Sequence, residues 1–308
     1  VNDLMGSRGC SVGSHLRELM GWFPRLDREF IVPKVRSWSL VPLFAAVVFL
    51  ATLEALAGDS FQSQESLRRP VALALTEDDS HLLVANRDEG SVSVIDTKTL
   101  KLLGETKIGR RLTDIERLDR KHVLATDEAA HELIVIAIKG KQLNIAARLS
   151  VSPFPQDIEV TAAGDKAYVT SLWSRQVSVI DLADRKSPRL TATIDLPLAP
   201  NKQLLVSGGK TLIVADNFSG RLAIVNCETN QLVTIRKFFA ENIRGLAIDP
   251  DSGFLAISHT MLNEYAHTVR NDVHWGVLMS NDLRWLRLNE VLDPAGDFYN
   301  KGHMHPLG

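Results

Sequence analysis

The chain has 308 residues, of which 45% are hydrophobic and 23% are charged, so it can bury a large core and has the composition of a globular protein. Its 35 basic and 37 acidic residues leave a formal charge of −2, and no block of like charge forms a basic stripe. No field attracts nucleic acid or an anionic membrane surface, and we expect no nucleic-acid partner.

The first element in chain order is an apolar run with the pattern of an export signal. Residues 39–53, SLVPLFAAVVFLATL, follow the basic Lys34 and Arg36 and end just before Ala55-Leu56-Ala57. A positive start, a short apolar stretch and an A-x-A site are the parts of a secretory signal peptide, whereas a transmembrane helix needs about 20 apolar residues. Residues 34–57 are thus predicted to be a signal peptide cleaved after the second alanine. An uncleaved N-terminal anchor is the alternative, and it would be the chain's contact with a membrane.

The stretches on either side of this segment add little. Residues 1–33 fit no targeting pattern and stay unassigned, and residues 58–67 are interpreted as a linker. Export places the remaining residues, 68–308, in the periplasm, on the cell surface or outside the cell.

From residue 68 onward, one pattern of short strands recurs five times. Matching apolar residues stand at intervals of 40, 45, 45 and 43 residues, at Val84, Leu124, Val169, Val214 and Ile257. In the first four copies a second apolar peak follows 11 or 12 residues later, at Ile95, Ile136, Ile180 and Val225. Strands rich in Val, Ile and Leu, separated by Asp, Gly, Asn and Ser turns, give four strands per copy.

This period predicts an all-β fold. A four-stranded sheet of this size cannot bury both faces alone, so the copies must pack face to face around an axis as the blades of a β-propeller. An immunoglobulin-like sandwich would need about seven strands and about 100 residues per unit, and the shorter period argues against it. Residues 68–308 are therefore predicted to form a propeller with five visible four-stranded blades.

Several segments of the repeats carry a family motif. Ala167-Tyr168-Val169-Thr170-Ser171 nearly reproduces the YVTN sequence, with Ser171 in place of Asn, and Val84-Ala85-Asn86 is a looser version. Ser91-Val92-Ser93-Val94-Ile95-Asp96 matches the third strand of such a blade and its closing turn. Over roughly residues 68–291 the chain resembles the bacterial YVTN-type seven-bladed β-propellers. The resemblance implies the fold but no single function, because members serve as surface proteins, ligand binders and electron-transfer modules.

Five copies fall short of the seven blades that the resemblance implies. We therefore expect that the propeller is incomplete at its C-terminal end. Some related bacterial propeller proteins continue into a cytochrome c domain, which would lie beyond Gly308 here. An open set of blades leaves apolar faces without a neighbour, so we expect this chain to aggregate or dimerise.

Histidines gather near the C-terminal end of the sequence. In a blade of strands A to D, the B–C loop and the link from D to the next blade fall on the same face. The fifth repeat carries an insertion of about ten residues in its B–C loop, and loops longer than a repeat requires are often functional. Of nine histidines, five lie in or near this region and are expected to converge on one face: His259, His267, His274, His303 and His305.

Three interpretations of these histidines remain open. With Glu264, Asp272 and Met304 they can bind a transition metal such as copper, zinc or iron, although no HExxH spacing is present. They can instead form a polar surface that binds a protein or a small molecule. They can also be unrelated loop and edge residues.

Two further candidates stand in the B–C loops. Trp173, in the third repeat, either anchors a partner or packs against the neighbouring blade. Arg87, in the first repeat, belongs to a possible ligand-binding rim. Asp88 in the first repeat, Asp127 in the second and Asp216 in the fourth follow strand ends, and the plainer interpretation is that they bind backbone N–H groups in tight turns.

The sequence carries no motif for catalysis. Gly208-Gly209-Lys210 lacks the spacing of a phosphate loop, and no nucleophile elbow, GxGxxG or paired-carboxylate pattern is present. Cys10 precedes the predicted cleavage site, which leaves Cys227 alone in the mature chain. One cysteine cannot form a disulfide or a CxxC zinc site, and no CxxCH motif for covalent c-type haem is present. No resident cofactor is predicted, apart from a possible metal at the histidines.

Two functions from different classes follow. The favoured one is an exported propeller that acts as a binding or scaffold module for a protein, polysaccharide or small ligand on its loop face. The alternative is the propeller portion of a periplasmic electron-transfer or oxidase protein whose haem or metal domain lies beyond the end of the chain. An enzymatic activity of the propeller itself is not favoured.

Overall fold

The computed structural model describes residues 67–263, 265–274, 278–296 and 303–307. They belong to the second of two compact units, which spans Ser63–Gly308. The predicted signal peptide or anchor and the extension before it lie outside the described residues. In the described part the helices are short, and none is long and apolar enough to cross a membrane. They are η1 (Ser207–Gly209), α2 (Arg270–His274) and α3 (Leu288–Leu292).

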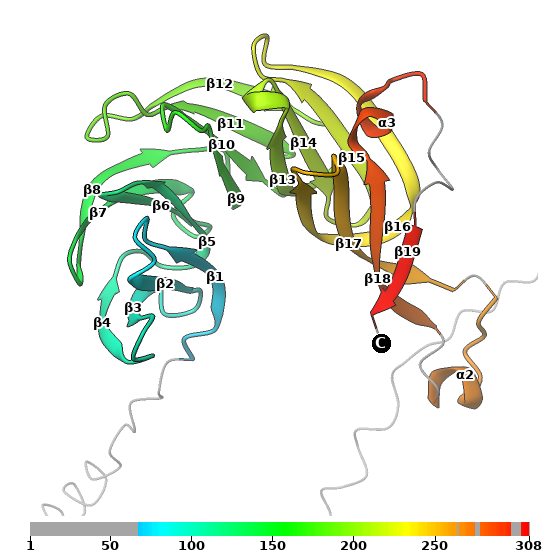
Figure 1. Ribbon diagram of the computed structural model, residues 1–308, viewed down its shortest axis with the longest axis horizontal. Helices are drawn as coiled ribbons and strands as arrows, with labels where there is room; N and C mark the ends of the chain where they lie inside the picture. The colour runs from blue at the N-terminus through cyan, green and yellow to red at the C-terminus, as the bar shows by residue number, and fades with distance from the viewer. Residues whose placement is uncertain (1–66, 264, 275–277, 297–302, 308) are drawn as a thin grey trace, which may run out of the picture. The chain divides into compact units, whose positions relative to one another are not determined.

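The described residues form four antiparallel sheets in chain order, so the all-β prediction is confirmed (Figure 1). The first sheet consists of β1 (Pro70–Leu75), β2 (His81–Asn86), β3 (Ser91–Asp96) and β4 (Leu102–Lys107). The second consists of β5 (Leu112–Asp119), β6 (His122–Asp127), β7 (Glu132–Lys139) and β8 (Gln142–Ser150). The third consists of β9 (Pro155–Val160), β10 (Lys166–Ser171), β11 (Gln176–Asp181) and β12 (Arg189–Asp195).

The fourth sheet has seven strands, and each strand pairs with its neighbour in sequence. They are β13 (Pro200–Val206), β14 (Thr211–Asp216), β15 (Ser219–Asn226), β16 (Gln231–Asp249), β17 (Phe254–Leu262), β18 (Met279–Arg287) and β19 (His303–Leu307).

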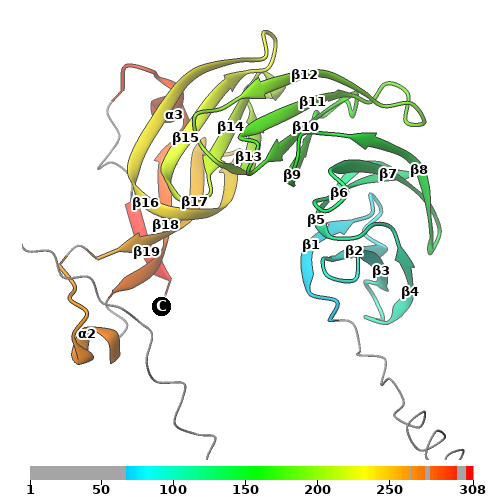
Figure 2. The ribbon, with the colours of Figure 1, turned by 180° about the vertical axis from the view of Figure 1, so that it is seen from behind.

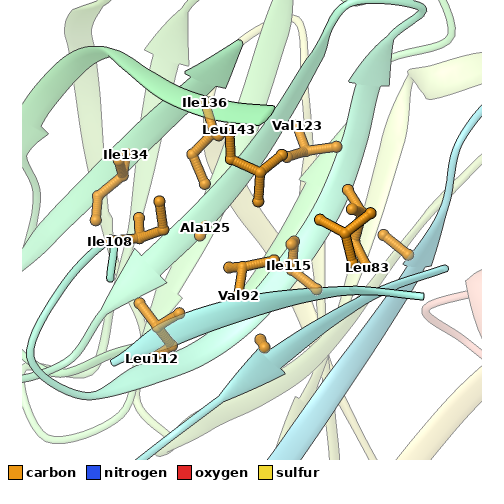
Figure 3. Packing of buried hydrophobic residues seen from close by; sticks show 13 residues of the cluster. Leu83, Val92, Ile108, Leu112, Ile115, Val123, Ala125, Ile134, Ile136 and Leu143 are labelled. Carbon is orange, nitrogen blue, oxygen red and sulfur yellow. The ribbon is translucent and has the colours of Figure 1, made fainter. Parts of the chain in front are cut away.

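Successive sheets pack face to face through apolar layers, as the repeat predicts. Between the first and second sheets, side chains from both form one buried cluster (Figure 3), which includes Leu83 and Val92 of the first sheet and Ile134 and Ile136 of the second, all with 0% exposure. Similar layers join the second sheet to the third and the third to the fourth. Successive side chains of a strand point to opposite faces, so a continuous apolar run such as Leu133–Ile136 of β7 supplies the layers on both sides of its sheet.

The packing of the second sheet corrects the predicted alignment of the second repeat. Val169 packs toward the preceding sheet, and so does Ala125. Leu124 packs toward the following sheet instead. The counterpart of Val84 in the second repeat is therefore Ala125 and not Leu124, because a one-residue shift moves a side chain to the opposite face.

The fifth repeat does not form a sheet of its own. Its first strand is the second half of β16, which runs without a break from Gln231 to Asp249. The first half of β16 pairs with β15 and the second half with β17. Between the earlier repeats the strand pairing is interrupted: residues 108–111, for example, separate β4 from β5, which belong to different sheets. The predicted counts of five visible and seven intact blades are therefore not confirmed.

The two halves of the fourth sheet nevertheless pack against each other. One apolar cluster joins Ile213 and Leu222 from the fourth repeat to Leu255 and Ile257 from the fifth, and Val291 of α3 completes it. The fifth repeat thus packs one apolar face against the fourth repeat, as a blade does. Its strands are nevertheless hydrogen-bonded into the same sheet as those of the fourth repeat.

The first strand of each sheet lies on the inner side of the arrangement. β1 contacts β5, β5 contacts β9, and β9 contacts β13. Figures 1 and 2 show these strands on the inside and β4, β8 and β12 on the outside. This is a β-propeller arrangement. The side of β1 turned away from the second sheet exposes Val71, Leu73 and Leu75 to 40%, 61% and 43%, so one apolar face has no neighbour within the described residues.

Candidate functional site

The B–C turns and the links between sheets come together on one surface. Leu172 N, in a B–C turn, donates a hydrogen bond to Phe154 O in the preceding link at 3.0 Å. Asn217 N donates in the same way to Ala199 O at 2.8 Å. We call this surface the loop face and define it by residues 86–91, 108–111, 127–132, 151–154, 171–176, 196–199 and 216–219.

Polar side chains at the ends of the B strands hold these turns in place. Asp127 accepts hydrogen bonds from the backbone N–H groups of Arg110 at 2.7 Å and Ala130 at 3.1 Å. Asp216 accepts one from Phe218 N at 3.3 Å. Both carboxylates are fully buried. The interpretation of Asp127 and Asp216 as turn-forming residues is confirmed, whereas the Asp88 carboxylate makes no such hydrogen bond among the described residues.

The loop face exposes aromatic side chains in the turns of the third and fourth sheets and in the link before the third. Trp173 and Phe218 come from equivalent turns of the third and fourth sheets and are 60% and 52% exposed. Their ring centroids lie 5.8 Å apart, with the rings inclined by 39°. Phe154, 38% exposed, lies in the preceding link and contacts the His131 ring edge-on at 5.0 Å. Trp173 therefore contacts the next repeat and still leaves most of its surface in water.

Cationic side chains stand beside this aromatic pair. Arg175 lies in the same turn as Trp173 and is exposed, and within the described residues its guanidinium makes no hydrogen bond or ion pair. Arg244 is also exposed, and its Nη1 donates to Asn217 Oδ1 at 3.4 Å. Carboxylates also lie near the pair, because Asp195 pairs in register with Gln176, next to Arg175, and Glu241 pairs with Ser219, next to Phe218. The surroundings of the aromatic pair thus carry charges of both signs.

Arg87 occupies the equivalent turn of the first sheet. Its guanidinium pairs with Glu128 of the second sheet's turn, so its charge is already matched. A hollow of about 420 Å³ lies between the same two sheets. Its lining includes Lys107 and Arg148, which pair with Glu89 and Glu132, at 3.2 and 2.8 Å.

The predicted histidines differ in their surroundings. His259 is 3% exposed in β17, its ring lies 5.9 Å from that of Phe238, and burial lowers its pKa. His267 and His274 are exposed in the insertion between β17 and β18. His303 and His305 lie on β19, and their side chains are outside the described residues.

In the strand register, His303 and His305 on β19 lie two strands from His259 on β17. His303 pairs with Trp285 and His305 with Leu283, whereas His259 pairs with Asp282. Among the described residues, no group of three or more His, Cys, Asp or Glu side chains is arranged to hold a metal ion. A metal site that includes β19 stays a prediction.

A group of carboxylates on the inner strands was missed by sequence reasoning. Asp114 of β5 and Asp157 of β9 are 8% and 6% exposed. Asp114 accepts a hydrogen bond from Ile158 N at 2.8 Å, and Asp157 accepts one from Gln203 N at 3.0 Å. Asp157 also pairs with Lys202 of β13. An inner strand is the edge of its sheet, so these N–H groups have no ladder partner, and the preceding sheet supplies one.

Two glutamates extend this group along the same strands. Burial, together with the neighbouring Asp114, raises the pKa of Glu116 to about 7, and burial with Asp157 raises that of Glu159 to about 8. A sequence signal for the group exists, since Asp-Ile-Glu occurs at 114–116 and again 43 residues later. Its hydrogen bonds join neighbouring sheets, and we assign it a structural role.

Comparison with known proteins supports the fold and leaves the function open. No family model matches the chain. Uncharacterized protein YncE of Salmonella typhi is 32% identical over 149 residues, which are 46% of this chain and 40% of that protein. The same protein of Salmonella typhimurium matches equally. The chain thus spans less than half the length of these curated relatives.

Solved structures with a similar fold come from proteins with different activities. Kuenenia stuttgartiensis hydrazine synthase matches with a TM-score of 0.65 and 18% identity, over 81% of this chain and 68% of that one. The periplasmic gluconolactonase of Pseudomonas aeruginosa matches with 0.59 and 20%, over 78% and 70%. A putative 6-phosphogluconolactonase of Bacteroides fragilis matches with 0.57 and 14%, over 78% and 70%. At these identities the likeness concerns the fold alone.

Proposed function

We propose that this chain is an exported binding module, built on a propeller of YVTN type, that holds a partner at the Trp173–Phe218 pair on its loop face. The observation that carries the proposal is the exposure of both rings in equivalent turns of neighbouring sheets. Contiguous exposed apolar groups often mark interaction surfaces in soluble proteins. Trp is also among the residues that contribute most to binding energy.

Burial of the Trp173 and Phe218 rings under a partner is energetically favourable. Fully burying a large apolar side chain stabilises a complex by about 1.5–3 kcal/mol. The turns that present the pair are held by the buried Asp216 and by backbone hydrogen bonds to the preceding links. A partner therefore meets a surface that is already ordered, which lowers the entropic cost of binding.

The comparisons are compatible with this role and do not select a ligand. The neighbours include hydrazine synthase and a periplasmic gluconolactonase, and one fold often serves unrelated functions. The predicted signal peptide at 34–57 supports export. Within the described residues, no observation favours the alternative of an electron-transfer module.

An array that carries oligosaccharides and short peptides tests the proposal with the full chain. Trp173→Ala and Phe218→Ala should each weaken the wild-type signals by about 5- to 100-fold, as expected for a buried aromatic anchor. Val233→Ala is the matched control, because Val233 is 54% exposed but lies at the opposite end of its sheet. The proposal fails if the wild type binds neither class, or if both aromatic variants bind as the wild type does.

A further inference from the structure

A titratable side chain accepts one hydrogen bond of the link that holds the Trp173 turn. Resting on the proposed function, we infer that protonation of His131 loosens this turn, so that the Trp173–Phe218 pair binds its partner more weakly in acid than at neutral pH. Three features lead to this regulation: the acceptor atom on the imidazole, the serine that replaces an aspartate in the third repeat, and the hydrogen bonds that join the link to the turn.

His131 accepts a backbone hydrogen bond through a ring nitrogen. The N–H of Phe154 donates to Nδ1 of His131 at 3.2 Å, and the two rings contact edge-on at 5.0 Å. An N–H group only donates, so Nδ1 carries a lone pair in this arrangement. When an imidazole takes up a second proton, both of its nitrogens become donors, and turning the ring cannot restore the acceptor. Imidazole groups in general make this change between about pH 5 and about pH 8.

The N–H groups that correspond to that of Phe154 in the neighbouring repeats have carboxylate acceptors. In the link before the second sheet, Arg111 N donates to Asp127 Oδ1 at 3.2 Å. In the link before the fourth sheet, Ala199 N donates to Asp216 Oδ1 at 3.3 Å. The carbonyl oxygen of each of these three link residues accepts an N–H from the turn that follows, so their positions correspond.

Ser171 takes the place of these aspartates in the third repeat. It ends β10 as Asp127 ends β6, and its hydroxyl donates to Ser152 O at 2.8 Å. The Phe154 N–H instead donates to His131, in the turn of the preceding sheet. Carboxylates ordinarily lose their proton near about pH 4, well below imidazole groups. The third repeat thus has a titratable acceptor where its neighbours have a carboxylate.

Phe154 in turn holds the segment that presents Trp173. Its carbonyl oxygen accepts the Leu172 N–H at 3.0 Å. Ser174 Oγ, on the other side of Trp173, donates to Pro153 O at 3.1 Å. The φ of Phe154 is +62°, in the left-handed region that bulky residues rarely adopt, so the backbone keeps this conformation only while its contacts hold. Loss of the imidazole acceptor therefore loosens the link to which the Trp173 turn is bonded.

The carboxylates in the turn of His131 already have partners. Asp127 accepts backbone N–H groups of the turn and of the preceding link. Glu128 and Glu132 each pair with an arginine. The other charged side chains on the neighbouring strands, links and turns are Arg87, Asp88, Arg110, Arg111, Arg148 and Arg175. The carboxylates of this turn are therefore engaged, and the loss of the acceptor atom is the main effect of protonation.

Hydrogen–deuterium exchange of the full chain measures the hold on the Trp173 turn without any ligand. After correction for the chemical exchange rate, the peptide that contains Leu172 should exchange about 2- to 10-fold faster at about pH 5.5 than at about pH 7.5, the factor that one hydrogen bond contributes. His131→Asn keeps an acceptor oxygen, tolerates the φ of +58° and does not titrate, so its exchange should stay slow at both pH values. His131→Gly also tolerates this φ but has no acceptor, so its exchange should be fast at both.

The array of oligosaccharides and short peptides, read at the same two pH values, connects the turn to binding. Signals that depend on Trp173 should weaken by about 2- to 10-fold in acid for the wild type, stay strong for His131→Asn and stay weak for His131→Gly. His122→Gln is the matched control, because His122 begins β6 at the opposite end of the same sheet. This variant should respond to pH as the wild type does.

Other titrating groups and the proposed function are separated by the same variants. Asp157 and Glu159 of β9, which follows the link, have pKa values raised to about 7 and about 8. They titrate in every variant, so only a response that is lost in His131→Asn belongs to His131. Equal exchange of the wild type at both pH values, or an acid response of His131→Asn as large as that of the wild type, overturns the inference and keeps the proposed function. If exchange follows His131 but Trp173→Ala and Phe218→Ala leave all array signals intact, the proposed function fails and the inference with it.

Discussion

Removing the carboxylate of Asp157 should weaken the contact between the third and fourth sheets. One carboxylate oxygen accepts the Gln203 N–H at 3.0 Å, and the other pairs with Lys202. Asp157→Ala therefore leaves a buried backbone N–H without a partner and removes the nearest counter-charge of Lys202. Asp157→Asn can keep the hydrogen bond through its amide oxygen and loses mainly the charge.

The contacts set the size of the expected effect. A buried N–H left without a partner costs about 1–3 kcal/mol. The Lys202 side chain is 37% exposed, so water screens its ion pair, which contributes at most about 1 kcal/mol. The loss of Asp157 also relieves its repulsion with the buried Asp114. We expect Asp157→Ala to lower the free energy of unfolding by about 2–3 kcal/mol and Asp157→Asn by about 1 kcal/mol.

Urea unfolding of the full chain, followed by circular dichroism, measures these differences. Asp195→Ala is the matched control, because Asp195 is exposed and bonds only to a neighbouring side chain. It should stay within about 0.5 kcal/mol of the wild type. The role assigned to the inner carboxylates is refuted if Asp157→Ala is as mild as this control, or if the Ala and Asn variants cost the same.

Three further predictions concern other parts of the chain. Gly220→Ala places a methyl group against the carbonyl oxygen of Phe238, and should lower the free energy of unfolding by about 2 kcal/mol or more in urea. Because the pKa values of Glu116 and Glu159 are raised to about 7 and about 8, the folded chain keeps protons that the unfolded chain has released. The free energy of unfolding should therefore fall as the pH rises from about 5 to about 8, by up to about 1.4 kcal/mol per pH unit for each carboxyl. Cys227 is 3% exposed and burial raises its pKa, so a thiol reagent should label it in urea but not in the native state.

Each of these predictions has a contradicting outcome. A Gly220→Ala variant as stable as the wild type would mean that β15 and β16 approach less closely here. In thermal melts over the same pH range, the double change Glu116→Gln with Glu159→Gln should reduce the slope and leave the share of Asp157, whose pKa burial raises to about 7. An unchanged slope would assign it to other groups. Rapid labelling of Cys227 in native buffer would show that the layer between the third and fourth sheets opens easily.

The repeat and its packing could be predicted from the sequence because they depend on local patterns. Short strands rich in Val, Ile and Leu recur at a nearly constant period, and turn-forming residues such as Asp127 and Asp216 recur at strand ends. A four-stranded unit with two apolar faces has few ways to bury both, so face-to-face packing follows. The one-residue error at Leu124 arose because its true counterpart, Ala125, is small and lacks the apolar bulk that marks the other copies.

Contacts between residues distant in sequence decided the rest. Trp173 meets Phe218 only because the next sheet brings an equivalent turn beside it, and neither turn alone predicts a shared aromatic pair. Asp114 and Asp157 are surface-type residues by composition, and they are buried because the following inner strand presents N–H groups that need acceptors. The continuity of β16 likewise depends on whether the link after Lys237 stays hydrogen-bonded to β15 and β17. The energy of such contacts depends on partners about one repeat away in the sequence. The periodicity of the sequence therefore determines the repeating sheets. The tertiary structure determines which side chains meet between them.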